Sequence, residues 1–256
     1  MFRNMEVGVI GVTLYCTIFT LGVWRLWVHC VPYCPPFYAT RKLFHFLLTV
    51  YSMLQIISFQ SFISEDAASY TKTGYTCHLL AIWIEIVAFS LVVILWSKTL
   101  LSVKHARRVT IPFLFSVVMI YFLYILFIIY RMNKSPKSFK NFAKDSRAFM
   151  YLLVIEPMVL GCIGACVLMD GQKILQKLSK NPAWSLLSKK QKRTSMFRLV
   201  KTMLICCSCF AVRAVLEILA FCGRDRHISG DLWFITSNWL PTIIPACVLM
   251  YSLVRP

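Results

Sequence analysis

Four charged residues lie deep within long apolar segments of this 256-residue chain: Glu85, Glu156, Arg213 and Glu217. Charged groups at membrane depth are costly, and they face other helices or a water-filled cavity. Arg213 and Glu217 are one helical turn apart and share a face. Because Arg before Glu is the weaker order for such a pair, Glu85 and Glu156 are alternative partners for the guanidinium.

These four residues are expected at one level of the membrane. With a rise of about 1.5 Å per residue, all lie roughly 8–15 Å below the outer boundary. Trp239 reaches a similar depth, and its ring is a candidate to stack on the guanidinium of Arg213. Two interpretations stay open. The layer is either a structural ion-pair lock between three helices, or a polar pocket in the outer half for a ligand or ion.

The elements that must position this layer are membrane-spanning helices. Hydrophobic residues make up 59% of the chain, above the roughly 45–50% of ordinary soluble domains. Apolar runs of about 20 residues recur along it, as expected of spanning helices. We predict an all-α membrane protein, a receptor-like seven-transmembrane-helix bundle that forms one domain over residues 1–256. The first apolar segment is expected to remain as a signal anchor. The helices are expected at about 5–29, 42–62, 75–100, 110–130, 148–172, 199–222 and 232–253.

The distribution of Lys and Arg predicts an orientation for the bundle. With the N-terminus outside or lumenal and the C-terminus cytoplasmic, 16 Lys and Arg fall on the cytoplasmic side and 10 on the other. Cytoplasmic loops carry the excess of basic residues in membrane proteins. In this orientation Asn133 is a glycosylation acceptor on the outer side, although Pro136 after the motif disfavours its use. Cys77 and Cys222 fall at outward helix ends and are a candidate disulfide.

Prolines and small residues predict local features of the helices. Pro157, Pro241 and Pro245 are expected to kink their helices, because proline removes a backbone donor and clashes with the preceding turn. Gly161 and Ala165 form a small-xxx-small pattern, which favours close contact with a neighbouring helix.

A basic connector precedes the sixth helix. The fifth helix is expected to continue into the cytosol through Lys177, until Asn181-Pro182 ends it. The basic cluster that follows a short apolar patch can lie on an anionic leaflet or dock an acidic protein surface. The net charge of +18 arises largely from such loops, so no nucleic-acid partner is expected. The cluster consists of Lys189, Lys190, Lys192 and Arg193.

Several segments, in order, resemble a known family. They are TRKLFHFLLTVYSMLQIISF from Thr40, AFSLVVILWSKTL from Ala88, MLICCSCFAVRAVLEIL from Met203 and LPTIIPACVLMYSLVRP from Leu240. Together they resemble the tobamovirus multiplication proteins of plants and the related orphan-receptor-like seven-helix lysosomal proteins of animals. The chain departs from that pattern where it has Trp239 in place of an acidic residue before the proline of helix seven.

The resemblance implies a non-enzymatic, receptor-like bundle in vacuolar, lysosomal or other endomembranes. It also implies partnership with small GTPases of the Arf-like or Rag type at the cytoplasmic face. The hypothesis is therefore a scaffold or regulator that recruits such partners through basic cytoplasmic loops.

Two alternatives are a divergent seven-helix receptor with a polar outer-half pocket and a transporter or channel. No enzyme, cofactor or metal is expected. Zinc catalysis takes about three protein ligands, and only His45 and His78 fall in spans, at opposite ends.

Overall fold

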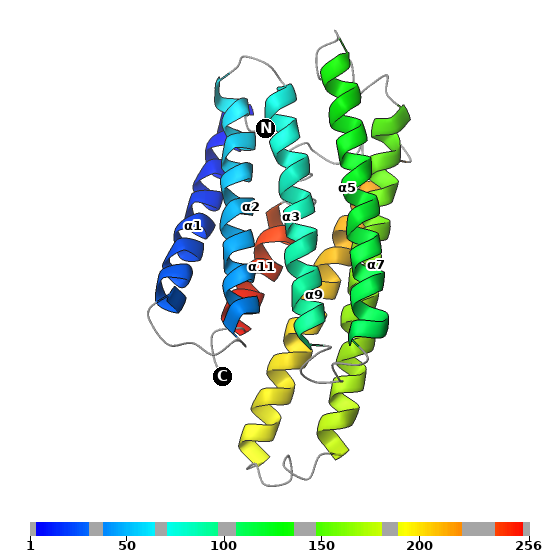
Figure 1. The fold of residues 1–256 in the computed structure, drawn as a ribbon. Coiled ribbons are helices and arrows are strands. Elements are labelled where there is room, and N and C mark those ends of the chain that lie inside the picture. Colours follow the sequence, from blue (N-terminus) through cyan, green and yellow to red (C-terminus); the bar gives the residue numbers. More distant parts are fainter. Residues whose placement is uncertain are drawn as a thin grey trace.

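The computed structural model describes residues 4–30, 38–64, 71–96, 106–135, 147–180, 189–221 and 239–252. Within these ranges the chain is almost entirely helical. Figure 1 shows long helices that run alternately up and down, with the two termini at opposite ends of the bundle. The helices are α1 (Asn4–Cys30), α2 (Tyr38–Ser64), α3 (Lys72–Trp96), the short π-helix η2 (Ala106–Thr110), α5 (Ile111–Lys134), α7 (Arg147–Lys180), α9 (Lys189–Phe221) and α11 (Leu240–Ser252).

Five of these helices are long and apolar enough to cross a membrane. The chain is thus an α-helical membrane protein. In α7 the apolar stretch is shorter, Val154–Cys166, and α11 has 13 residues. The five candidate spans are Glu6–Val28, Lys42–Ser61, Lys72–Ile94, Arg108–Lys134 and Val200–Leu219.

Helix α9 differs most from the expected boundaries. It begins at Lys189, ten residues before the expected start, although its apolar span begins at Val200 as expected. The cluster of Lys189, Lys190, Lys192 and Arg193 therefore lies on a helix rather than in a loop. Lys, Arg and Gln are good helix formers, so this stretch extends the span beyond its apolar part. Helix α7 runs to Lys180, immediately before Asn181-Pro182.

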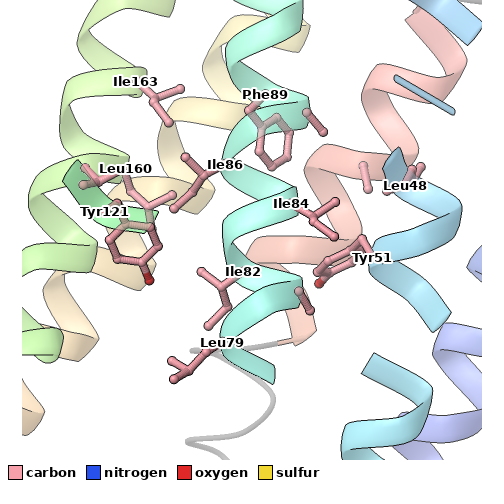
Figure 2. Close-up of a cluster of buried hydrophobic side chains, with 14 of the residues drawn as sticks. Leu48, Tyr51, Leu79, Ile82, Ile84, Ile86, Phe89, Tyr121, Leu160 and Ile163 are labelled. Atoms are coloured by element: carbon pink, nitrogen blue, oxygen red, sulfur yellow. The ribbon is translucent and has the colours of Figure 1, made fainter. Parts of the chain in front are cut away.

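Helix α3 forms the centre of the bundle. It packs against α2, α5 and α7. In its most apolar stretch 61% of the residues are buried, compared with 22% in that of α5. In Figure 2, Ile84 and Tyr51 lie on one side of α3, while Ile86, Tyr121 and Leu160 lie on the other. A helix that is covered on all sides is hydrophobic all round. Glu85, midway along α3, is consequently placed in the interior of the protein.

Close packing between helices is concentrated at α1 and α2. A Cβ at Gly11 would lie 2.5 Å from Cδ1 of Phe59, and one at Gly22 would lie 2.6 Å from Oγ1 of Thr49. Gly161 was expected to make such a contact, but a Cβ there would meet nothing within 4 Å, so that expectation is wrong. In hydrocarbon, small residues at an interface let two backbones approach closely. The glycines of α1 do this, and Gly161 faces outward.

One polar contact joins the start of α3 to the end of α5. The Lys72 Nζ donates a hydrogen bond to the carbonyl oxygen of Ser135 at 2.5 Å. The N–H of Ser135 in turn donates to the carbonyl of Arg131 at 3.2 Å, which closes the last turn of α5. This contact sets the ends of the two antiparallel helices at the same level.

Candidate functional site: a buried polar layer

Arg213 lies in the second half of the apolar span of α9, Val200–Leu219, and its side chain is buried. Its Nε donates to Oε1 of Glu217 at 3.0 Å, one turn further along the same helix. Its Nη1 donates to Oε2 of Glu85 at 3.2 Å, and its Nη2 donates to Oε1 of Glu156. The less favourable order of Arg before Glu does not prevent the pair within α9. The guanidinium binds all three carboxyl groups at once.

Three helices besides α9 hold this charged cluster. Glu85 lies midway along α3, and Glu156 lies in α7. Tyr121 of α5 donates its hydroxyl hydrogen to the second oxygen of Glu156, Oε2, at 3.3 Å. All of these side chains are buried. These hydrogen bonds join α3, α5, α7 and α9. They are stronger than the same bonds in water, because water is excluded from the cluster.

A second polar cluster lies among the other helices and contains hydroxyl groups alone. The hydroxyl of Tyr15 in α1 lies 3.3 Å from that of Tyr51 in α2 and 3.3 Å from Oγ1 of Thr242 in α11. Thr242 also donates to the carbonyl of Trp239 at 3.2 Å. The ring of Tyr15 stacks on Phe59, with 5.6 Å between centroids. Each hydroxyl is thereby satisfied inside the protein.

A small cavity lies between the two clusters. Its volume of about 10 Å³ is roughly that needed to hold one water molecule. Glu85 of the charged cluster lines it together with Tyr51 and Thr242 of the hydroxyl cluster. The remaining lining is apolar and comes from Phe44, Leu48, Ala88, Phe89 and Ala246.

We call the two clusters and the cavity between them the polar layer. Each of the seven α-helices in the described ranges contributes at least one side chain to it. The polar layer consists of Tyr15, Tyr51, Glu85, Tyr121, Glu156, Arg213, Glu217 and Thr242.

The acidic and basic groups of the polar layer are unequal in number. Three carboxyl groups face one guanidinium, and Arg213 is the one Lys or Arg side chain that is buried among the residues the structure describes. Oε1 of Glu85 and Oε2 of Glu217 are buried without a hydrogen-bond partner in the structure. Uncompensated charge in a low-dielectric interior costs several kcal/mol, so such groups take up a proton or a counter-ion.

Trp239 does not stack on the guanidinium. It is buried, and its ring packs against Phe59 at 6.2 Å between centroids. The carboxyl groups engage Nε and both terminal nitrogens of Arg213. Trp239 instead belongs to the side of the bundle that holds the hydroxyl cluster, through its carbonyl bond with Thr242.

The prolines have different positions in their helices. Pro245 lies inside α11. Pro241 is the second residue of α11, but Trp239 before it is also helical and the residues that precede Trp239 lie outside the described ranges, so the kink at Pro241 stays a prediction. Helix α7 continues through Pro157 to Lys180 without interruption.

The other expected residues lie away from the polar layer. Asn133 is exposed on the last turn of α5. Lys177 lies on α7, and the basic cluster lies on the first turns of α9. The expected pairing of Cys77 with Cys222 involves a residue outside the described ranges. Cys207 donates to the carbonyl of Gly164 at 3.7 Å, which is a packing contact between α9 and α7.

Sequence reasoning missed the aromatic hydroxyls of the layer: Tyr15, Tyr51 and Tyr121. A signal was present, since each lies near the middle of an apolar segment, and a buried tyrosine hydroxyl usually has a hydrogen-bond partner. Which hydroxyls meet which partner depends on helix rotation, and one apolar sequence does not specify that rotation.

No family model, curated protein or solved structure matches this chain. The resemblance to the tobamovirus multiplication proteins and their animal relatives therefore stays a prediction from the quoted segments.

Proposed function

We propose that this chain is a non-enzymatic seven-span scaffold of endomembranes that recruits an acidic cytosolic partner, and that the partner is a small GTPase. In this proposal α7 and α11 also cross the bilayer, with the N-terminus lumenal and the C-terminus cytoplasmic. The placement of α7 and α11 supports the two additional spans. Both contribute to the polar layer at the depth of the five candidate spans, through Glu156 and Thr242.

The observation that carries the proposal is the length of α7 and α9. They have 34 and 33 residues, which at 1.5 Å per residue is about 50 Å. The hydrocarbon core is about 30 Å thick. Figure 1 shows that both helices extend beyond the others at the end where the C-terminus lies. We call residues 173–180 of α7 and 189–198 of α9 the basic projection.

The direction of the basic projection supports a protein partner over a lipid surface. A patch that binds the leaflet lies flat on it. The basic projection instead continues the axes of two spans (Figure 1), so its distal turns stand away from the leaflet. Lys177, Lys189, Lys190, Lys192 and Arg193 all lie on this segment. A cluster of basic groups held on a helical pair is complementary to an acidic protein surface.

The choice of a small GTPase of the Arf-like or Rag type, and of a vacuolar or lysosomal membrane, rests on the family resemblance. The alternative of a receptor with an organic ligand in the charged layer has less support. The cavity beside Glu85 holds about one water molecule, whereas ligand pockets have volumes of about 300–1,000 Å³. A transporter remains the third hypothesis, and solute flux in reconstituted vesicles tests it.

The experiment is capture of purified Arf-like and Rag GTPases by the full-length protein in nanodiscs. Lys189, Lys190, Lys192 and Arg193 are changed together to Gln. The matched control removes four positive charges from the last turn of α5 and from the sequence that follows it: Arg131, Lys134, Lys137 and Lys140.

We expect the first variant to lose capture and the control to retain it. Capture that is unchanged in the first variant rejects the proposal. A different result assigns the basic projection to the leaflet: no GTPase is captured by the wild type or by the first variant, and the first variant loses binding to vesicles that contain anionic lipid.

A further inference from the structure

The unequal charges of the polar layer have a simple resolution in its geometry. We propose that the polar layer binds two protons, one on Glu85 and one on Glu217, while Glu156 is the ionised partner of Arg213. With two protons bound, one carboxylate faces one guanidinium and the buried layer is neutral. This inference concerns the membrane interior and does not depend on the partner of the basic projection.

The hydrogen bonds distinguish the three carboxyl groups. A carboxylate accepts at both oxygens, whereas a protonated carboxyl group has an O–H on one of them. Glu156 accepts at both, from Arg213 at Oε1 and from Tyr121 at Oε2. Glu85 and Glu217 each accept from Arg213 at one oxygen, and the other oxygen is buried without a partner in the structure. These two orphan oxygens are where the protons belong.

Each proposed proton has an acceptor nearby. Glu85 lines the cavity together with Tyr51 and Thr242, and its volume of about 10 Å³ is at the lower limit for one water molecule, which would accept the proton of Glu85. Glu217 interacts with the neighbouring carboxylate of Glu156, which can accept a hydrogen bond from it. A buried pair of acids that share a proton is a known solution to like charges held close together.

A metal cation in the cavity is less compatible with the lining. The protein offers one carboxyl group and two hydroxyls there, whereas hard divalent cations take about six or more oxygen ligands. A cavity of one-water size leaves no space for waters to complete the shell. The proton needs a single acceptor, which one water molecule in the cavity would provide.

Other titratable groups surround the layer and are included in the test. His78 lies two turns before Glu85 on α3, and its Nδ1 is 3.2 Å from Oε1 of Gln55. Changing His78 to Gln controls for any proton that this ring carries. His78 interacts with Arg213. The groups of the packed helices that interact with the carboxyl groups are Tyr15, Tyr51, Tyr121 and Arg213.

The first measurement is infrared spectroscopy of the whole protein near neutral pH in an alkyl maltoside detergent, which has no ester carbonyl that would overlap the carboxyl band. Protonated carboxyl groups have a carbonyl stretching band that carboxylates lack. We expect this band in the wild type and in His78→Gln, and its loss in the double variant Glu85→Gln/Glu217→Gln. A wild-type spectrum without the band overturns the proposal, whether or not any variant folds.

The second measurement compares three double variants that each leave one carboxylate for Arg213. Gln has the shape of a protonated Glu. We expect Glu85→Gln/Glu217→Gln, which keeps Glu156, to melt within about 3 °C of the wild type. The two pairs that remove Glu156 are expected to melt at least about 5 °C lower, because neither remaining carboxyl group has the bond from Tyr121. Equal melting of the three pairs overturns the assignment.

A salt comparison separates protons from sodium. Melting is recorded in sodium chloride and in choline chloride at equal ionic strength. We expect no difference between the two salts. A sodium-dependent rise in the wild type that disappears in Glu85→Gln means that the cavity binds sodium, and it overturns the proposal.

Discussion

The two clusters of the polar layer lie at the same depth but join their helices through different kinds of group. The charged cluster joins α3, α5, α7 and α9 through one guanidinium. The hydroxyl cluster joins α1, α2 and α11 through neutral groups. A neutral hydroxyl can be replaced by an apolar group at modest cost, but a buried charge that loses its partner cannot be left alone. The two halves of the bundle should therefore respond very differently to mutation.

Close packing takes the place of ion pairs on the hydroxyl side. Within the described ranges, three glycines let their helices approach α2 closely: Gly11 and Gly22 of α1, at Phe59 and Thr49, and Gly74 of α3, at Ser61. On the charged side, Gly161 makes no such contact. One half of the bundle is thus held mainly by shape and the other by charge, and the following changes test that contrast.

The largest expected effect is that of Arg213→Met. Removing one member of a buried ion pair costs about 3–5 kcal/mol, and here three carboxyl groups lose their cation. We expect a large fall in melting temperature in detergent, or no folded protein. Arg213→Lys should recover only part of the loss, because an ammonium group cannot make the three directed contacts of the guanidinium. Wild-type melting of Arg213→Met would show that the charged cluster does not hold the bundle.

A smaller loss is expected for Tyr121→Phe. This change removes one hydrogen bond to the carboxylate of Glu156 and keeps the ring. Hydrogen bonds to charged groups contribute about 1.5–3 kcal/mol. Thermal unfolding measures the loss. Tyr130→Phe, which changes an exposed tyrosine on the same helix, is the control and should melt like the wild type.

On the other side, Gly11→Ala tests packing by shape. The new methyl group would overlap the ring of Phe59, and overpacking typically costs about 1–3 kcal/mol. Gly161→Ala places a methyl group in open space and should change stability by no more than about 0.5–1 kcal/mol. If both variants melt alike, the contrast in packing between the two halves is wrong.

The smallest effect is expected for Tyr51→Phe. It removes a neutral hydrogen bond with Tyr15, and such bonds contribute about 0.5–1.5 kcal/mol. The loss in unfolding free energy should be clearly below that of Tyr121→Phe. A larger loss than that of Tyr121→Phe would reverse the ranking of the two clusters.

The fold class and the charged residues were accessible from the sequence for physical reasons. Apolar runs of spanning length predict helices. A charged residue inside one of these helices predicts an oppositely charged partner within the bundle. The contacts of Arg213 with Glu85, Glu156 and Glu217 follow the expectation that a buried cation finds its acids.

The details that depend on helix rotation were not accessible. Trp239 was expected on the guanidinium but packs on Phe59, and Gly161 was expected at an interface but faces outward. Both residues are apolar or small, so neither carries a signal that fixes its direction. The early start of α9 was missed because apolar periodicity ends where its basic turns begin.

The most direct test of the account is a thermodynamic cycle with Arg213→Met, Glu156→Gln and the double variant. Replacing both members of a buried pair is often nearly neutral, while removing one is costly. We predict that Glu156→Gln added to Arg213→Met restores part of the lost stability, with a favourable coupling free energy of about 1–3 kcal/mol. Additive losses, with no coupling between the two positions, would contradict the claim that this ion pair ties the bundle together.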